Sequence, residues 1–104
     1  MTTRLDNKAP AEELTLTFDF SEGLGADVLL AGTPTASVAV LIGRDLNPAA
    51  LLNGAPAIDG TLTRVYLPVH AGNECCDYLI QVVCTTNASK VLALSAVLPV
   101  RSLS

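Results

Sequence analysis

A stretch of alternating side chains, Leu14–Phe20, is the feature that most limits what this chain can fold into. Its apolar residues are Leu14, Leu16, Phe18 and Phe20, and its polar residues are Thr15, Thr17 and Asp19. Successive side chains of a β-strand point to opposite faces, so this spacing puts every large apolar side chain of the stretch on one face. The stretch therefore predicts a strand with one face buried in a core.

Further stretches along the chain have the composition of strands, and no helix long enough to connect parallel strands is expected between them. They are Asp27–Ala31, Thr35–Ile42, Thr61–Val69, Asp77–Thr86 and Lys90–Val100. Because Thr35–Ile42 is almost continuously apolar, we expect it to be a central strand that is buried on both sides. Six to seven short strands, with turn signals about every ten residues, predict an all-β fold, an immunoglobulin-like antiparallel β-sandwich.

Glycine and asparagine mark the points where the chain is expected to turn. Asn53-Gly54 and Asp59-Gly60 favour type I′ hairpins, because these turns need positive φ at both central residues. Asn87-Ala88-Ser89 separates the last two strands and predicts a hairpin of adjacent antiparallel strands. For Asn47–Leu52 two interpretations are equally favoured, one helical turn capped by Asn47 or an ordered loop.

Residues 1–13 differ from the rest of the chain. They mix polar residues and proline without apolar periodicity, which is typical of a flexible arm or of a segment ordered only by a neighbour. We therefore expect a flexible N-terminal arm over 1–13 and one sandwich domain over 14–104. Neither the apolar part of a secretory signal nor a run of about 20 apolar residues occurs, so we expect a soluble, cytoplasmic product without a membrane partner.

The composition indicates which classes of partner the protein is expected to bind. A net charge of −4 gives no basic field for phosphates, so we expect no nucleic-acid partner. Half of the residues are hydrophobic and only 15% are charged, which favours a protein that buries part of its surface against other proteins. The alternative is that small residues such as Ala39, Ala93 and Ala96 raise the hydropathy without forming an adhesive patch.

Catalysis is not expected, because its usual groups are scarce. His70 is the single histidine of the chain, and a Cys75/His70 pair would lack a third residue to orient it. Adjacent cysteines in a strand point to opposite faces, so Cys75 and Cys76 do not form a metal-binding pair. We predict no catalytic residue, no cofactor and no metal, with Cys84 and Cys76 buried and Cys75 as the exposed thiol.

Three segments together resemble a known family. They are Leu16-Thr17-Phe18-Asp19-Phe20-Ser21, the strand Tyr78-Leu79-Ile80-Gln81-Val82 after a loop at Gly72, and the closing hairpin that ends in Leu98-Pro99-Val100. This pattern is similar to small immunoglobulin-like virion structural proteins of tailed bacteriophages, of the fiber-tail adaptor or head-tail accessory type. The resemblance implies that Tyr78 is the analogue of a tyrosine corner, whose hydroxyl bonds to nearby backbone.

The resemblance also implies a function, a connector or adaptor between other virion proteins at the neck or tail. It implies a homo-oligomeric ring in the virion, made from protein synthesised in the host cytoplasm. Contacts are expected from the arm Thr2–Ala11, from the loop Gly43–Pro56 and from an exposed edge strand. The predicted partner-binding residues are Thr3, Arg4, Leu5, Arg44, Leu46, Leu51 and Leu52. The alternatives are a capsid decoration protein and a free module that binds a host surface or carbohydrate.

Overall fold

The computed structural model describes residues 2–5, 7–24, 26–29 and 34–101, and strands make up about half of this part of the chain. The strands are β1 (Thr2–Arg4), β2 (Leu14–Asp19), β3 (Thr35–Ile42), β4 (Ala57–Ile58), β5 (Arg64–Val69), β6 (Cys76–Thr85) and β7 (Val91–Val100). A short helix, α1 (Ser21–Leu24), follows β2, and a 3-10 turn, η1 (Pro48–Leu51), follows β3. The prediction of an all-β fold is confirmed.

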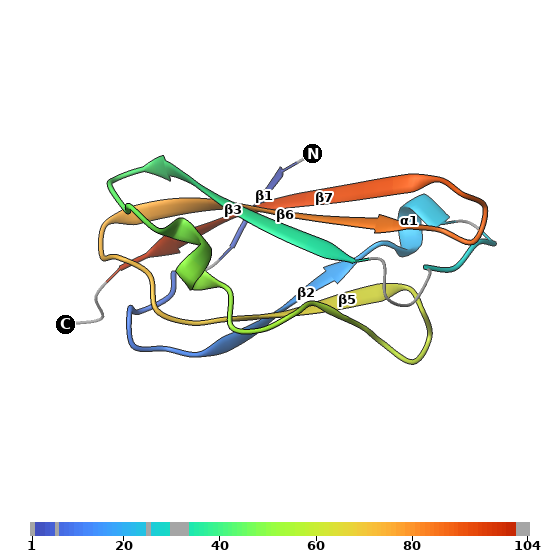
Figure 1. The fold of residues 1–104 in the computed structure, drawn as a ribbon, viewed down its shortest axis with the longest axis horizontal. Helices are drawn as coiled ribbons and strands as arrows, with labels where there is room; N and C mark the ends of the chain where they lie inside the picture. Colours follow the sequence, from blue (N-terminus) through green and yellow to red (C-terminus); the bar gives the residue numbers. More distant parts are fainter. Residues whose placement is uncertain (1, 6, 25, 30–33, 102–104) are drawn as a thin grey trace.

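The strands form two sheets that face each other in an elongated molecule of 45 × 22 × 21 Å (Figure 1). The larger sheet has the order β1-β7-β6-β3 and the smaller one β2-β5-β4. Neighbouring strands are antiparallel, except that β1 runs parallel to β7. The two long strands β6 and β7 form the predicted closing hairpin and are the middle of the larger sheet.

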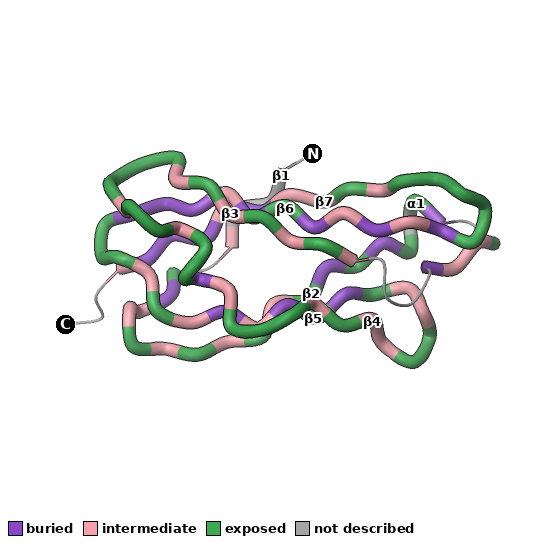
Figure 2. Tube along the Cα trace, viewed as in Figure 1, coloured by how far each residue is buried: buried purple, intermediate pink, exposed green. Residues whose placement is uncertain are grey.

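The core lies between the sheets, and the alternation of the strands determines which side chains fill it (Figure 2). In β2 the apolar positions face inward and the Thr positions are exposed, as the sequence predicts. In β6 the inward residues Tyr78, Ile80, Val82 and Cys84 are fully buried. The predictions for the cysteines are also confirmed, because Cys84 and Cys76 are buried and Cys75 is exposed.

Strand β3 has the predicted ends, but its predicted place in the sheet is wrong. It is an edge strand that pairs with β6, and its side chains alternate between half-buried and exposed. The inward residues are Ala36, Val38 and Val40, and the exposed residues between them are Thr35, Ser37 and Ala39. The exposed apolar residues Ala39, Leu41 and Ile42 made the stretch look almost continuously apolar, although the burial of 35–40 follows the period of a half-buried strand.

Of the two predicted reversals, the one at Asp59-Gly60 is observed, but its conformation differs from the prediction. The reversal predicted at Asn53-Gly54 is wrong, because the chain runs antiparallel to β5 on both sides of it, with Leu52 opposite Val69 and Ile58 opposite Val65. Between β4 and β5 the residue with positive φ is Leu62 (59°), and no positive φ occurs at Gly60, so this is not a type I′ turn. Asp59 stabilises the loop instead, because its Oδ1 accepts hydrogen bonds from the backbone N–H groups of Thr63 and Arg64, both at 3.1 Å.

The structure also bears on the predictions for Asn47–Leu52 and for Asp27–Ala31. Of the two interpretations of Asn47–Leu52, the helical turn is observed as η1, although the side chain of Asn47 makes no capping bond. In the predicted strand Asp27–Ala31, Leu29 forms an isolated bridge with Thr86, and residues 30 and 31 lie outside the described residues.

The N-terminal segment, predicted to be a flexible arm, lies along the edge of the larger sheet. Strand β1 pairs with β7, with Arg4 opposite Val97. The attachment continues beyond the strand, where the backbone N–H of Lys8 donates to the carbonyl oxygen of Pro99 at 2.9 Å. These residues are far apart in the sequence, so no local pattern could indicate their pairing.

Lys8 fastens this segment to the loop that follows β5. Its side chain is fully buried, and Nζ donates to the carbonyl oxygens of Ala9 (2.8 Å), Pro10 (3.3 Å) and Ala71 (2.5 Å). Burial lowers the pKa of Lys8 from its ordinary value, because it disfavours the charged form, and the attraction of Glu12 offsets part of this effect.

This lowered pKa predicts a stability that increases with pH. Between the pKa of folded Lys8 and its ordinary value of 10.5, the unfolded chain binds more protons, so raising the pH favours the folded state. Lys8→Met should remove that contribution, which urea unfolding at several pH values above about 8 would measure. Lys90→Met, at an exposed position, should retain it. Equal behaviour of the two variants would contradict the prediction.

Candidate partner-binding surface

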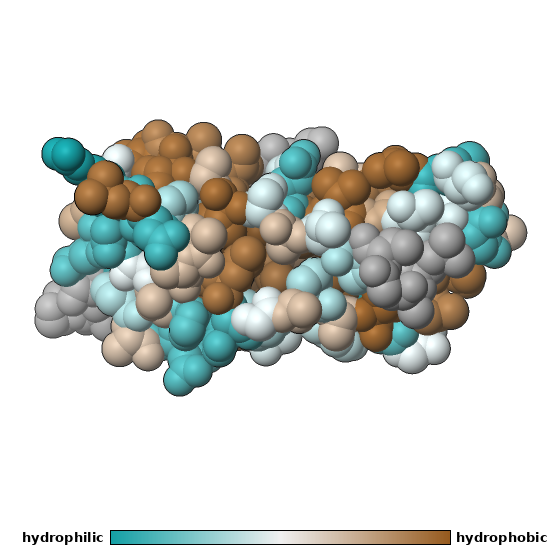
Figure 3. All heavy atoms as spheres, in the orientation of Figure 1, coloured by the Kyte–Doolittle hydropathy of each residue, from teal (hydrophilic) through white to brown (hydrophobic). Residues whose placement is uncertain are grey.

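One end of the molecule carries exposed apolar side chains, which we call the apolar tip. It consists of Leu41 and Ile42 at the end of β3 and Leu46 in the loop that follows. Their exposed fractions are 52%, 59% and 90%. Figure 3 shows hydrophobic residues at the surface at this end. Because contact of large aliphatic side chains with water is unfavourable, another molecule that covers the tip would gain free energy.

A register shift in β3 explains why two neighbouring residues are both exposed. Val40 lies opposite Tyr78 and Ile42 lies opposite Asp77, so Leu41 is an extra residue between two consecutive partners. Such a bulge interrupts the alternation of inward and outward side chains. A regular strand would have turned either Leu41 or Ile42 toward the core.

The backbone beneath the tip is packed tightly against the beginning of β6. Gly43 has a φ of 96°, and a Cβ at this position would lie 2.6 Å from Sγ of Cys76 and 2.9 Å from the carbonyl oxygen of Cys75. The carbonyl oxygen of Arg44 accepts hydrogen bonds from Nδ2 of Asn73 (3.0 Å) and from Sγ of Cys76 (3.5 Å). The loop is therefore held from below, while its outer side chains remain exposed.

Tyr78 supplies the central attachment of this loop. Its hydroxyl oxygen accepts a hydrogen bond from the backbone N–H of Asn73 and donates one to Oδ2 of Asp45, both at 2.7 Å. The predicted bond between this hydroxyl and nearby backbone is confirmed. Burial, and the adjacent carboxylate of Asp45, raise the pKa of Tyr78 well above its ordinary value. Oδ1 of Asp45 also accepts from the backbone N–H of Asn47 at 2.9 Å.

The predicted partner-binding residues of this region lie at different depths. Arg44 and Leu46 are exposed in the tip loop, and Leu52 is half-buried. Leu51 is only 1% exposed, because η1 turns its side chain into the core between the sheets. The expectation that Leu51 contacts a partner is corrected for this reason, since its side chain offers no surface.

The predicted residues of the N-terminal segment lie on the other side of the molecule, beside β7. Thr3 and Arg4 belong to β1, and Leu5 is half-buried beside an open groove of about 740 Å³ between β2 and β7. Leu92 and Leu94 also line this groove, in the part of β7 that β1 does not reach. The groove contains no group of the apolar tip, so the predicted residues form two separate surfaces.

Sequence reasoning missed Leu41 and Ile42 as members of the candidate surface, and it missed the role of Asp45 in fastening the loop. The two apolar residues belonged to a stretch that was expected to be buried on both sides. No local signal marks their exposure, because the apolar run Val38–Ile42 is continuous up to the Gly43 turn and does not indicate the bulge. The role of Asp45 depends on Tyr78, 33 residues away, so no local pattern indicates it.

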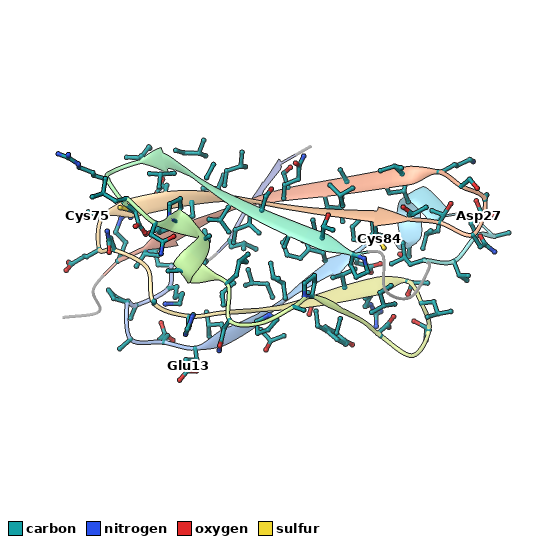
Figure 4. The ribbon with its side chains drawn as sticks, in the orientation of Figure 1. Glu13, Asp27, Cys75 and Cys84 are labelled. Atoms are coloured by element: carbon teal, nitrogen blue, oxygen red, sulfur yellow. The ribbon has the colours of Figure 1, made fainter. Side chains whose placement is uncertain are left out.

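The groups that could carry out chemistry are scattered. Figure 4 shows Cys75 and Cys84 far apart along the molecule, and Cys75 is an exposed thiol, whereas Cys76 and Cys84 are buried. The backbone N–H of His70 donates to the carbonyl oxygen of Leu51 at 2.9 Å. Within the described ranges, no group of three or more His, Cys, Asp or Glu side chains is arranged to hold a metal ion. None of the helices in these ranges is long and apolar enough to cross a membrane.

Comparison with protein-family models and with curated proteins gives no match for this sequence. The candidate surface is therefore defined by its own geometry, an exposed apolar tip on a loop that Tyr78 and Asn73 hold in place.

Proposed function

We propose that the protein is a structural adaptor without catalytic activity, which binds another protein through the apolar tip. The observation that carries this proposal is Leu46, a side chain that is 90% exposed on a loop bonded from below. A large apolar residue on a preorganised loop loses little conformational freedom when a partner covers it. Such residues are suited to act as anchors at the centre of an interface.

We further propose that the two sheets form an immunoglobulin-like sandwich. The strand order supports this, because β3-β6-β7 and β2-β5-β4 correspond to the C-F-G and B-E-D sheets of that fold. Tyr78 supports it as well, since it lies near the start of β6 and accepts a hydrogen bond from the backbone five residues upstream. A tyrosine corner has this arrangement.

Within this class, we propose a virion protein of the tailed-bacteriophage type, present as a ring at the neck or tail and bridging other virion proteins. The similarity of the three sequence segments supports this assignment. A capsid decoration protein remains the alternative. A carbohydrate-binding module has less support, because Phe18, Phe20 and Tyr78 are buried and Tyr66 is 38% exposed, which leaves few aromatic rings for stacking on a sugar.

Leu46→Asp should strongly reduce incorporation of the protein into particles. A buried leucine contributes roughly 1.5–3 kcal/mol, so we expect a loss of about tenfold or more in affinity for the partner. Val91→Asp is the matched control, because Val91 is 67% exposed and pairs with Thr85 at the end of β6, whereas Ile42 of the tip lies opposite Asp77 near the beginning of β6. Quantitative mass spectrometry of purified particles, with each variant replacing the wild-type protein, would measure incorporation.

The copy number in the same experiment separates the alternatives. A ring of about six or twelve copies supports the adaptor, and hundreds of copies support a decoration protein. Absence of the protein from particles would contradict a virion function. Equal incorporation of the Leu46→Asp and Val91→Asp variants would contradict the assignment of the tip.

A further inference from the structure

The outer edge of β3 is only partly protected against pairing with another strand, by the bulge after Val40 near its end and by η1, which contacts the strand. Among the described strands, β3 pairs with β6 alone, so its other edge has no ladder. Its sequence, TASVAVLI, contains no charged residue and no proline. Soluble proteins usually protect a long edge strand with charged side chains, proline or a covering segment. An eight-residue edge without charge is therefore suited to accept another strand.

The inward face of β3 also lacks full cover. Ala36, Val38 and Val40 pack against the core but are only half-buried, whereas the inward residues of the neighbouring strand β6 are fully buried. A strand added to the outer edge of β3 would cover these three side chains. Such a strand has to present small or β-branched apolar residues on the same face and no charge.

The sequence of β3 itself meets these requirements. In an antiparallel self-pairing centred on Val38, Val38 lies opposite its own copy and Ala36 lies opposite Val40, so the inward apolar residues pair with one another. On the outward face Ser37 lies opposite Ala39. This register keeps Pro34, which lacks a backbone N–H, and the bulge after Val40 at the ends of the ladder. A register centred on Ser37 would instead place Pro34 opposite Val40.

We propose that β3 pairs with β3 of a second copy of this chain, antiparallel and about a twofold axis at Val38. The paired sheets then form one continuous sheet across the dimer, through an interface that uses the same surface of both copies. Because the axis reverses the direction of β3, the two apolar tips point in opposite directions. This last consequence rests on the proposed function, since such a dimer can bridge two partner molecules.

Charge substitutions on the outward face test both the pairing and its register. Ser37→Lys with Ala39→Lys places like charges opposite each other twice in the dimer, whereas Ser37→Lys with Ala39→Glu places opposite charges there twice. Both positions are exposed in the single chain, so both double variants should fold alike, which circular dichroism checks. Analytical ultracentrifugation over a concentration series, at low ionic strength, measures the dissociation constant of the dimer.

We expect a concentration-dependent dimer for the wild-type protein and a dissociation constant at least about tenfold higher for the Lys/Lys variant than for the Lys/Glu variant. A wild-type protein that stays monomeric would overturn the proposal, and so would two variants that weaken the dimer equally. Neither result bears on partner binding by the apolar tip, because Leu46 is unchanged in both variants. Failure of the Leu46→Asp experiment, in turn, would leave the β3 dimer standing.

Discussion

Tyr78→Phe is expected to lower the free energy of unfolding by about 1–3 kcal/mol, although the aromatic ring remains in the core. The change removes the hydroxyl that joins the backbone N–H of Asn73 to the carboxylate of Asp45. Both groups were bonded at 2.7 Å, and the N–H of Asn73 would then lack its partner. The cost is that of leaving polar groups unpaired in a partly buried site.

The matched control for this change is Tyr66→Phe. Tyr66 is 38% exposed on β5, so loss of its hydroxyl should change the stability by less than about 0.5 kcal/mol. Urea unfolding of both variants and of the wild-type protein would measure the difference. Equal costs for the two substitutions would show that the hydroxyl of Tyr78 does not fasten the loop.

The features that could be predicted from the sequence are those with a local period. Leu14–Phe20 and the hairpin of β6 and β7 alternate over many residues, so their inward faces follow from the geometry of a strand. The same parity places Cys84 with Tyr78 on one face and leaves Cys75 outside the core. Of the candidate site, Arg44, Leu46 and the backbone bond of Tyr78 were expected from the resemblance to a known family and not from a local period.

The features that could not be predicted depend on pairs that are distant in the sequence. The composition of β3 suits a central strand or an edge strand equally well, and its place is decided by which strands cover it. The pairing of β1 with β7 and the burial of Lys8 are nonlocal in the same way. Exposure of Leu41 and Ile42 depends on a bulge, which alternation alone does not indicate.

Gly43→Ala is expected to lower the free energy of unfolding by about 2–5 kcal/mol, and to weaken partner binding by the tip as well. A side chain at a φ of 96° costs about 1–2 kcal/mol, because positive φ is unfavourable for residues with a Cβ. The added Cβ would also approach the carbonyl oxygen of Cys75 to 2.9 Å, and such overpacking adds about 1–3 kcal/mol. Because that oxygen belongs to the backbone, the tip loop has to move away from β6.

Gly54→Ala separates the two contributions, since Gly54 has a similar φ of 102° but no heavy atom within 4 Å of an added Cβ. This control should show only the conformational cost of about 1–2 kcal/mol and should leave binding by the tip unchanged. Thermal or urea unfolding gives the stabilities, and incorporation into particles gives the binding. If Gly43→Ala destabilised no more than Gly54→Ala, the loop would not be packed tightly against β6. If Gly43→Ala destabilised the protein and left incorporation unchanged, the position of this loop would not matter to the partner.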